Sequence, residues 1–265
     1  MSGIILIHGA WASSWIWQRL TPLLQRAGHQ VAAPDMPGTG LDLADKQKIT
    51  MFDHLDHLAH LGDQFDGPVH LVAHGLSGAI ITEFAERHPH MAASVTYFSS
   101  IFARPGVVPS GLPMDTPTTS STTYTPTGEK IALTPEIAAD LAFDDCSAED
   151  RDRFRNLMEK ASCDPPIPPL DHPTGHWEKL PRAYFLCLRN KMVLRAQQQQ
   201  MIRRHNCGPV IKLHTGHCPF LTQPQIVADH LDQFVRRADR TFEIGNSGHD
   251  DRPVRWAADQ DEGRL

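Results

Sequence analysis

Residues 69–89 constrain the fold more than any other segment of this chain. A short, continuous apolar run at Val69–Ala73 is typical of a buried parallel strand. It leads into the sequence His74-Gly75-Leu76-Ser77-Gly78, in which the glycines indicate a tight turn. A helical run over Ala79–His88 follows and ends before Pro89. A buried strand that turns sharply into a helix predicts an α/β fold.

The same alternation of strand and helix extends along most of the chain. Further strands are expected at Gly3–Ile7, Gln30–Ala33, Ala93–Phe98, Ala183–Leu188 and Val210–Leu213. Helices are expected at Trp15–Ala27, after Thr50 with Asp53 completing a capping box, at Ala196–Arg204 and at Ile226–Arg236. This order predicts a mostly parallel sheet that is covered by helices on both faces.

The alternation is interrupted between residues 104 and 180. Two stretches there, Pro105–Thr127 and Pro165–Pro173, are rich in proline, and helix signals stand between them near Thr134 and at Ser147–Met158. We therefore expect a cap at 104–180, inserted into a core made of 1–103 and 181–237. The polar, mixed-charge tail at 238–265 is predicted to be disordered.

The composition limits the class of partner. The 265 residues are 40% hydrophobic and 21% charged, which suits one globular domain. The net charge of −6 argues against nucleic acid or an anionic membrane as a partner and favours a small-molecule substrate. No apolar run approaches the ~20 residues of a membrane-spanning helix, and the first predicted strand leaves no room for a signal peptide. A homodimer is left open.

The cysteines indicate the compartment. The five cysteines form neither a C-x-x-C pair nor a metal-ligand spacing. They are expected to be free thiols in a reducing, cytoplasmic environment, and no metal or other cofactor is expected.

Four motifs, taken in order, resemble the α/β-hydrolase superfamily, in the branch of plant-type methylesterases and hydroxynitrile lyases. They are His8-Gly9-Ala10-Trp11, Asp35–Gly40, residues 71–79 and Gly216–Phe220, and the segment Phe143–Asp150 is also similar to that branch. The resemblance covers about residues 3–237. It implies an α/β-hydrolase fold with an inserted cap, and a site built from a nucleophile, a histidine and an acid.

A glycine stands at the position that aligns with the nucleophile of the family. Aligning Ala73-His74 with the Gly-His pair of the family pattern places Gly75 where the serine belongs. An alternative register makes Ser77 the nucleophile, but it shortens the following helix and loses the preceding histidine. The sequence favours Gly75 at the turn, with Ser77 as the alternative nucleophile.

The other site residues follow from the same resemblance. His217 matches the catalytic histidine, and the backbone N–H groups of Ala10 and Leu76 match an oxyanion hole. The acid is replaced by Asn190, which can orient an imidazole but cannot stabilise its cation as a carboxylate does. Asp144 or Asp145 could approach from the cap instead.

The expected substrate is a small molecule with a carbonyl or ester group. Candidate wall residues of its pocket are Trp11, Phe102, Phe143 and Trp177, with His74 beside the turn. The missing hydroxyl favours non-covalent acid/base chemistry of the lyase, isomerase or cyclase type, in which His217 acts as base or acid. The alternatives are an ester hydrolase, either with Ser77 as its nucleophile or as an inactivated esterase variant, and a catalytically inactive ligand-binding protein.

Overall fold

Six parallel strands form the centre of the protein in a computed structural model that describes residues 1–40, 49–100, 122–124, 130–132, 134–158 and 175–246. Their order in the sheet is β2-β1-β3-β4-β7-β8. The strands are β1 (Gly3–Ile7), β2 (Gln30–Ala32), β3 (Val69–His74), β4 (Ala92–Phe98), β7 (Arg182–Cys187) and β8 (Val210–Leu213). The predicted parallel sheet is therefore confirmed.

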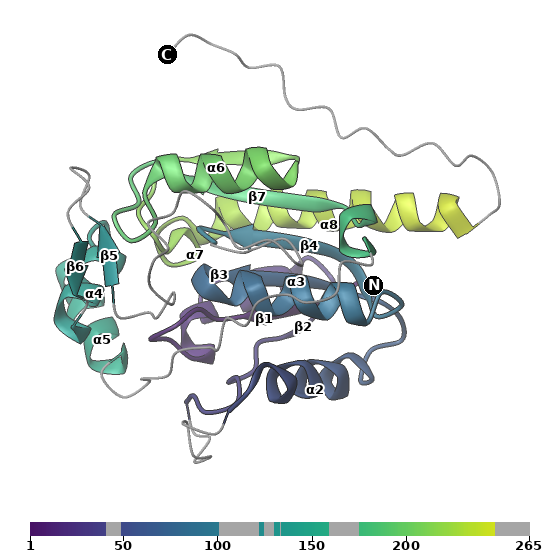
Figure 1. The fold of residues 1–265 in the computed structure, drawn as a ribbon, viewed down its shortest axis with the longest axis horizontal. Helices are drawn as coiled ribbons and strands as arrows, with labels where there is room; N and C mark the ends of the chain where they lie inside the picture. Colours follow the sequence, from purple (N-terminus) through teal and green to yellow (C-terminus); the bar gives the residue numbers. More distant parts are fainter. Residues whose placement is uncertain (41–48, 101–121, 125–129, 133, 159–174, 247–265) are drawn as a thin grey trace, which may run out of the picture.

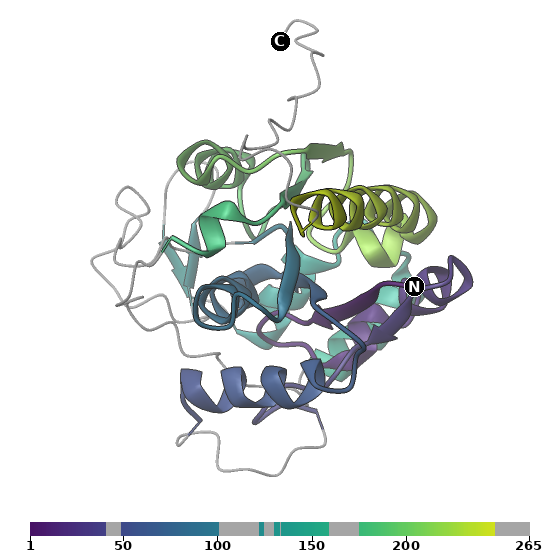
Figure 2. The same cartoon turned by 90° about the vertical axis from the view of Figure 1, so that its right-hand side faces the viewer.

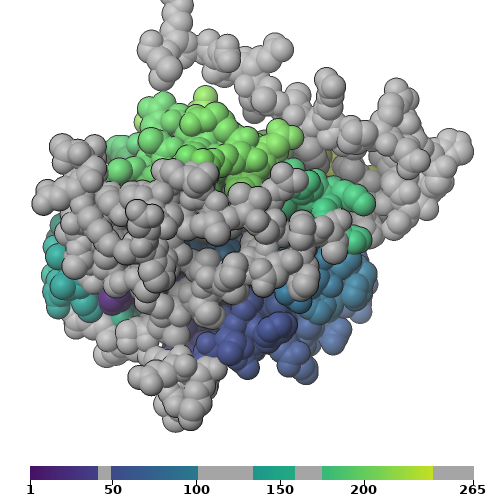
Figure 3. Space-filling view, in the orientation of Figure 1, coloured from purple at the N-terminus to yellow at the C-terminus, as the bar shows by residue number. Residues whose placement is uncertain are grey.

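Helices cover both faces of this sheet, as predicted (Figures 1 and 2). One face carries α1 (Thr21–Arg26) and α8 (Pro224–Asn246). The other carries α2 (Met51–Gly62), α3 (Gly78–Arg87) and α6 (Arg195–His205). In the space-filling view, α2 and α6 are exposed at opposite margins of one side of the molecule (Figure 3). The fully buried strands separate two apolar cores, which suits a sheet that is covered on both sides.

The two strands at the centre of the sheet are buried along their whole length. Every residue of β3 and β4 is buried, including the polar residues His70, Ser94 and Thr96. The hydroxyl of Ser94 lies 2.8 Å from Nδ1 of His70, so these two side chains satisfy each other inside the core.

The predicted helix Trp15–Ala27 is divided in two. A short 3₁₀ helix, η1 (Ser14–Trp17), precedes α1, which has Pro22 in its first turn. Proline lacks a backbone N–H and suits the start of a helix rather than its interior, so it separates the two segments.

Two further helices lie beyond the carboxyl edge of the sheet, within the predicted cap. They are α4 (Pro135–Ala142) and α5 (Ala148–Met158), with a small hairpin of β5 (Thr122–Tyr124) and β6 (Lys130–Ala132) beside them (Figure 1). Phe143 and Phe154 pack with Trp15, whose ring stacks on Phe154 at 5.4 Å. Arg19 forms an ion pair with Asp150 at 2.7 Å. Aromatic packing and this ion pair join α5 to the sheet-bearing part.

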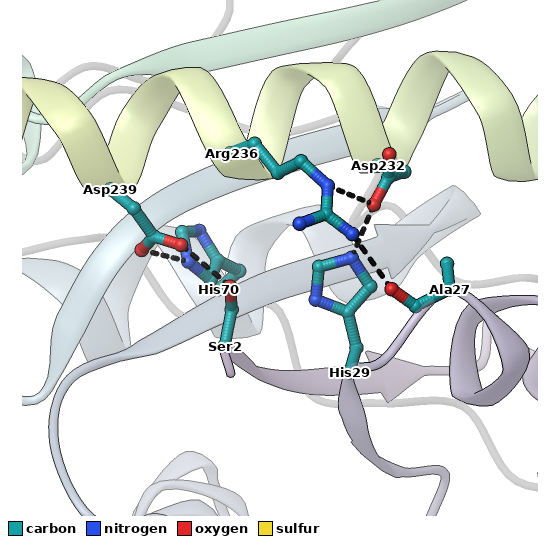
Figure 4. Close-up of polar contacts among 7 residues, drawn as sticks. All are labelled: Ser2, Ala27, His29, His70, Asp232, Arg236 and Asp239. Carbon is teal, nitrogen blue, oxygen red and sulfur yellow. Dashed lines mark hydrogen bonds and ion pairs between the residues drawn. The ribbon is translucent and has the colours of Figure 1, made fainter.

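Helix α8 continues past the point where the sequence predicted disorder. The predicted tail began at Ala238, whereas α8 extends to Asn246. Ala238 is buried, and the next residue, Asp239, accepts hydrogen bonds from His70 at 2.9 Å and from Ser2 at 2.6 Å (Figure 4). These contacts with β3 and the start of the chain stabilise the additional turns. Residues 247–265 of the predicted tail lie outside the described residues.

A second polar pair holds the preceding turns of α8. Asp232 lies 2.7 Å from the imidazole of His29 and 2.8 Å from the guanidinium of Arg236, which also donates to the carbonyl of Ala27 (Figure 4). Polar contacts thus hold the long helix near the middle of its buried stripe, at Asp232, and at the end of the stripe, at Asp239.

The cysteines in the described part of the chain, Cys146, Cys187, Cys207 and Cys218, are buried free thiols. Cys163 lies outside that part. Across the same described residues, no helix is both long and apolar enough to span a membrane.

Candidate active site

The predicted site residues meet at the carboxyl edge of the sheet. Residues of the loops after β1, β3, β4, β7 and β8 lie together there because the strands are parallel and end at the same edge.

The strand-to-helix turn after β3 is centred on Gly75. A short 3₁₀ helix, η3 (Gly75–Ser77), begins directly after the strand and runs into α3. Gly75 has φ of +57°, a conformation that suits glycine and costs other residues about 1 kcal/mol or more. A Cβ atom at this position would lie 3.9 Å from Nε2 of His217 and 3.9 Å from Cα of Gly9. A side chain at position 75 would therefore fit, and it would face His217.

The loop after β1 packs closely against this turn. A Cβ atom on Gly9 would lie only 2.9 Å from the carbonyl oxygen of His74, so no side chain fits there. His8 is held by three neighbours: its Nε2 accepts a hydrogen bond from the N–H of Met36 at 3.1 Å and lies 3.1 Å from the hydroxyl of Thr39, and its Nδ1 lies 2.9 Å from the carbonyl of Gly9. His8 is thus a structural residue that fixes the loop leading to Ala10.

Two non-glycine residues near the site have positive φ. Trp11 has φ of 64° and Ser99, directly after β4, has φ of 48°. Such conformations persist only where the surrounding structure enforces them, and they are concentrated at functional sites. The hydroxyl of Ser99 donates to the carbonyl of His217 at 3.3 Å, a contact that the sequence analysis missed. The sequence does contain a signal for this contact, because two serines, Ser99 and Ser100, directly follow the strand.

Ser77 does not face the histidine. It is buried, and its hydroxyl donates to the backbone carbonyl of His8. This bond joins the turn after β3 to the loop after β1. The alternative register, in which Ser77 attacks a substrate, therefore requires a hydroxyl that is already engaged elsewhere.

His217 lies in the loop after β8, next to the short helix α7 (Pro219–Thr222). Its ring is buried and lies 4.3 Å from the ring of His74 between centroids. Nδ1 of His217 is 3.1 Å from Nδ2 of Asn190, which confirms the predicted contact between these two residues.

The side-chain oxygen of Asn190 is used by the loop itself. It accepts hydrogen bonds from the backbone N–H groups of Met192 at 2.9 Å and Val193 at 3.0 Å. Asparagine and aspartate both form turns of this kind, in which a side-chain oxygen accepts from N–H groups two and three residues ahead. The loop after β7 is therefore organised around position 190.

Burial keeps both histidines of the site uncharged. Burial lowers the pKa of His217 to about 3. The pKa of His74 lies well below its ordinary value because of burial and, to a smaller extent, the proximity of His217. At neutral pH the site therefore contains two neutral imidazoles.

The cap aspartates contact the loops after β7 and β8 near His217. Asp145 accepts a hydrogen bond from the N–H of Gly216 at 2.6 Å, and Asp144 forms an ion pair with Lys191 at 2.9 Å. The ring nitrogen Nδ1 of His217 faces Asn190. These contacts join the cap to the loops after β7 and β8.

The structure places the predicted aromatic wall residues Phe143 and Trp177 in different core clusters. Phe143 is buried and packs against Trp15 of η1 and Phe154 of α5. The proposal for Trp177 is wrong, because its indole donates to the hydroxyl of Tyr97 at 2.8 Å within the core cluster on the opposite face from Phe143. Sequence alone does not reveal which face of the sheet an aromatic residue covers.

Two predicted wall residues remain, Trp11 and Phe102. Trp11 packs at the edge of the same core cluster as Phe143, and Phe102 lies outside the described residues. A cavity of about 770 Å³ lies between α2 and α3 and is lined by other residues, such as Phe52, Glu86 and His88. Among the described residues, no group of three or more histidine, cysteine, aspartate or glutamate side chains could hold a metal ion.

Comparison with known proteins establishes the family. Residues 4–230 match the alpha/beta hydrolase family, and the chain belongs to that family. The predicted superfamily is thereby confirmed.

Relatives include both hydrolases and a lyase. A pyrethroid hydrolase from Sphingobium wenxiniae is 26% identical over 279 residues, which cover 96% of this chain and 95% of the relative. The (S)-hydroxynitrile lyase of Manihot esculenta is 33% identical over 100 residues, covering 37% of this chain and 39% of the lyase. The crystal structure of the methylesterase MES16 from Arabidopsis matches with a TM-score of 0.73 and 20% identity, covering 89% of this chain and 100% of the methylesterase. At that identity, the structural match shows the fold alone.

Proposed function

We propose that this protein is an enzyme that acts on a small carbonyl- or ester-containing molecule without forming a covalent acyl intermediate. The observation that carries this proposal is the geometry at Gly75. The backbone turn holds position 75 opposite Nε2 of His217, but glycine supplies no attacking oxygen there. Reactions of the lyase, isomerase or cyclase type need a group that handles protons or hydrogen bonds and donors that stabilise a negative oxygen, but no nucleophile.

The proposed donors are the N–H groups of Ala10 and Leu76. Leu76 stands in the first turn of η3, where N–H groups have no acceptor within the helix, and no side chain caps that helix. Ala10 lies between Gly9, which packs against His74, and Trp11, whose positive φ marks an enforced backbone conformation. Two backbone donors at such a turn would stabilise a developing oxyanion by several kcal/mol.

Ester hydrolysis is the second candidate, and the names of the relatives support it. The pyrethroid hydrolase from Sphingobium wenxiniae matches over most of this chain. For this chain, hydrolysis would require His217 to activate water or Ser77 to turn away from His8. Loss of the nucleophile alone costs about 10⁶-fold in a well-studied serine protease, so efficient hydrolysis is not expected.

A covalent probe separates the two mechanisms. The parent protein is treated with an organophosphonate that labels serine hydrolases, and the adduct is located by mass spectrometry. We expect no adduct in the parent and labelling at position 75 in Gly75→Ser. An adduct at Ser77 in the parent, with a burst on p-nitrophenyl acetate, would refute the non-covalent proposal.

The positive test is activity that depends on His217. Cleavage of a hydroxynitrile to its aldehyde, and exchange of protons next to a ketone in deuterated water, are compared between the parent and His217→Gln. The proposal expects at least one of these reactions to be lost in the variant. If neither is catalysed, while His217→Gln weakens binding of a carbonyl ligand, the protein is a binding protein.

A further inference from the structure

The orientation of the Asn190 amide can be deduced from the backbone around it. Its oxygen lies 2.9 Å and 3.0 Å from the N–H groups of Met192 and Val193, both of which are donors. If the amide were rotated by 180°, its NH₂ group would face these two donors, and both backbone N–H groups would lose their acceptor. Each such loss costs about 1–3 kcal/mol, so the loop holds the oxygen where it is.

This orientation determines what His217 encounters. The amide group that remains for His217 is the NH₂ group, which lies 3.1 Å from Nδ1. An amide NH₂ only donates, so Nδ1 must accept and cannot carry a proton. In a neutral imidazole with an unprotonated Nδ1, the proton resides on Nε2.

We infer that Asn190 is a positioning residue that holds His217 as a neutral imidazole with its proton on Nε2, so that the ring donates a hydrogen bond to a substrate oxygen. Within the proposed function, on which this inference rests, His217 therefore donates a hydrogen bond to the developing oxyanion, and a proton that leaves the substrate is taken up by solvent water. The substrate oxygen occupies the space over Gly75, because Nε2 lies 3.9 Å from where a Cβ atom would stand.

An aspartate at the same place would have the opposite effect. One carboxylate oxygen could accept from the N–H groups of Met192 and Val193, while the other would accept a hydrogen bond from a protonated Nδ1, which leaves Nε2 unprotonated and free to act as a base. The loop would be retained and the polarity of the contact with His217 reversed. A neutral imidazole donor polarises a carbonyl without giving up its proton, which suits a reaction that builds negative charge on that oxygen.

The surroundings of His217 agree with this role. Burial is the cause of its low pKa, and of the nearby carboxylates one oxygen of Asp144 pairs with Lys191 and one oxygen of Asp145 accepts from the N–H of Gly216. The ring is therefore expected to remain neutral through the range in which proteins are ordinarily assayed.

Nuclear magnetic resonance of the protein with ¹⁵N-labelled histidine tests the inference directly. Long-range ¹H–¹⁵N correlations show which ring nitrogen carries the proton, and His217→Gln assigns the signal. We expect Nε2 to be protonated and Nδ1 unprotonated in the parent at pH 7, unchanged at pH 5.5. A proton on Nδ1, or a doubly protonated ring, overturns the inference without any variant at position 190.

A variant pair gives the second test. Asn190→Asp should move the proton to Nδ1, whereas Asn156→Asp, the same change on the exposed surface of α5, should leave the ring as in the parent. An unchanged tautomer in folded Asn190→Asp contradicts the role of Asn190. The spectrum is independent of turnover: an active enzyme with Nδ1 protonated refutes this inference alone, whereas an Nε2-protonated ring without activity dependent on His217 refutes the proposed function alone.

Discussion

Asp145 accepts a hydrogen bond from the backbone N–H of Gly216 at 2.6 Å, immediately before His217. The carboxylate belongs to the segment between α4 and α5, so this contact links the cap to the loop that carries the histidine. It also accounts for the glycine, because a Cβ atom at position 216 would lie 2.6 Å from Oδ1 of Asp145 and 2.7 Å from Oδ1 of Asp144.

Gly216→Ala should therefore displace the cap aspartates. We expect it to lower the free energy of unfolding by about 1–3 kcal/mol, as overpacking at a filled site does, and to disturb His217. Gly67→Ala is the matched control, because no atom lies within 4 Å of the added carbon. Urea unfolding measures both. Equal stability of the two variants would show that Asp145 can move aside at little cost.

Gly75→Ser should restore only part of a hydrolase. The side chain fits, but the positive φ at position 75 is expected to lower the free energy of unfolding by about 1 kcal/mol. Gly75→Ala should show the same loss. Turnover of p-nitrophenyl acetate should be slow in the parent and rise modestly in Gly75→Ser, because Asn190 leaves the proton on Nε2 of His217. Adding Asn190→Asp should raise the rate further and more than additively, since such groups act as a unit. Simple additivity of the two changes in log rate would contradict this coupling.

Ser77→Ala should affect folding rather than catalysis. Removing the hydroxyl leaves the carbonyl of His8 without this donor, and a loss of about 1 kcal/mol in the free energy of unfolding is expected. Ser94→Ala removes another buried, hydrogen-bonded serine, next to His70, and serves as the comparison. Unfolding in urea and turnover are measured on both. Rapid ester hydrolysis in the parent that Ser77→Ala abolishes would make Ser77 the nucleophile.

The stability of the protein should fall as the pH is lowered from 7 to 4. Burial is the main cause of the lowered pKa of His8, His54, His74 and His217, which is about 4 for His54 and about 3 for His217. An unfolded histidine binds a proton below about pH 6.5, whereas folded His54 and His217 remain neutral until the pH falls to about 4 and about 3. Each of these two therefore lowers the free energy of unfolding by about 1.4 kcal/mol per pH unit between its folded and unfolded pKa, and His8 and His74 act in the same direction. Urea unfolding at pH 7.5, 6.5, 5.5 and 4.5 measures the slope. His217→Gln should reduce this slope by the contribution of one bound proton. A stability that rises as the pH falls toward 5 would contradict the conclusion that these histidines are neutral in the folded protein.

Asp239→Asn should loosen the end of α8. Burial alone would raise the pKa of Asp239, but hydrogen bonds from His70 and Ser2 outweigh it and the net pKa is lowered, so its contribution is present above about pH 4 and is lost below it. Because the carboxylate is partly exposed, the expected loss at pH 7 is about 1 kcal/mol. Asp229→Asn on the exposed face of the same helix should be neutral. Amide hydrogen exchange localises the effect, and unchanged protection near Ala238 would show that apolar packing alone holds the helix.

Sequence patterns were sufficient where local chemistry decides the structure. The apolar runs Gly3–Ile7 and Val210–Leu213 are strands with those bounds, and the capping box of Thr50 and Asp53 starts α2. The extension of α8 was missed because its outer residues are polar, although Leu231, Phe234, Val235 and Ala238 continue a buried stripe at helical spacing.

In the candidate site, too, the sequence predicted which residues meet but not the details that depend on the folded loop. The sequence placed Asn190 beside His217, and the contact is present. It could not give the direction of the amide, because that depends on the N–H groups of Met192 and Val193, whose positions arise only when the loop folds. Trp177 was misplaced for a related reason: its partner Tyr97 is distant in sequence and reaches it only through the sheet.

The turn around Asn190 has a consequence for how such a site can change over evolutionary time. An oxygen at this position satisfies Met192 and Val193 whether the residue is asparagine or aspartate, and the space at Gly75 accepts a small side chain. Folding therefore exerts little selection between the two alternatives at either position. A lineage with this architecture could pass between nucleophilic and donor-only chemistry by two replacements, each tolerated by the fold before the other arises.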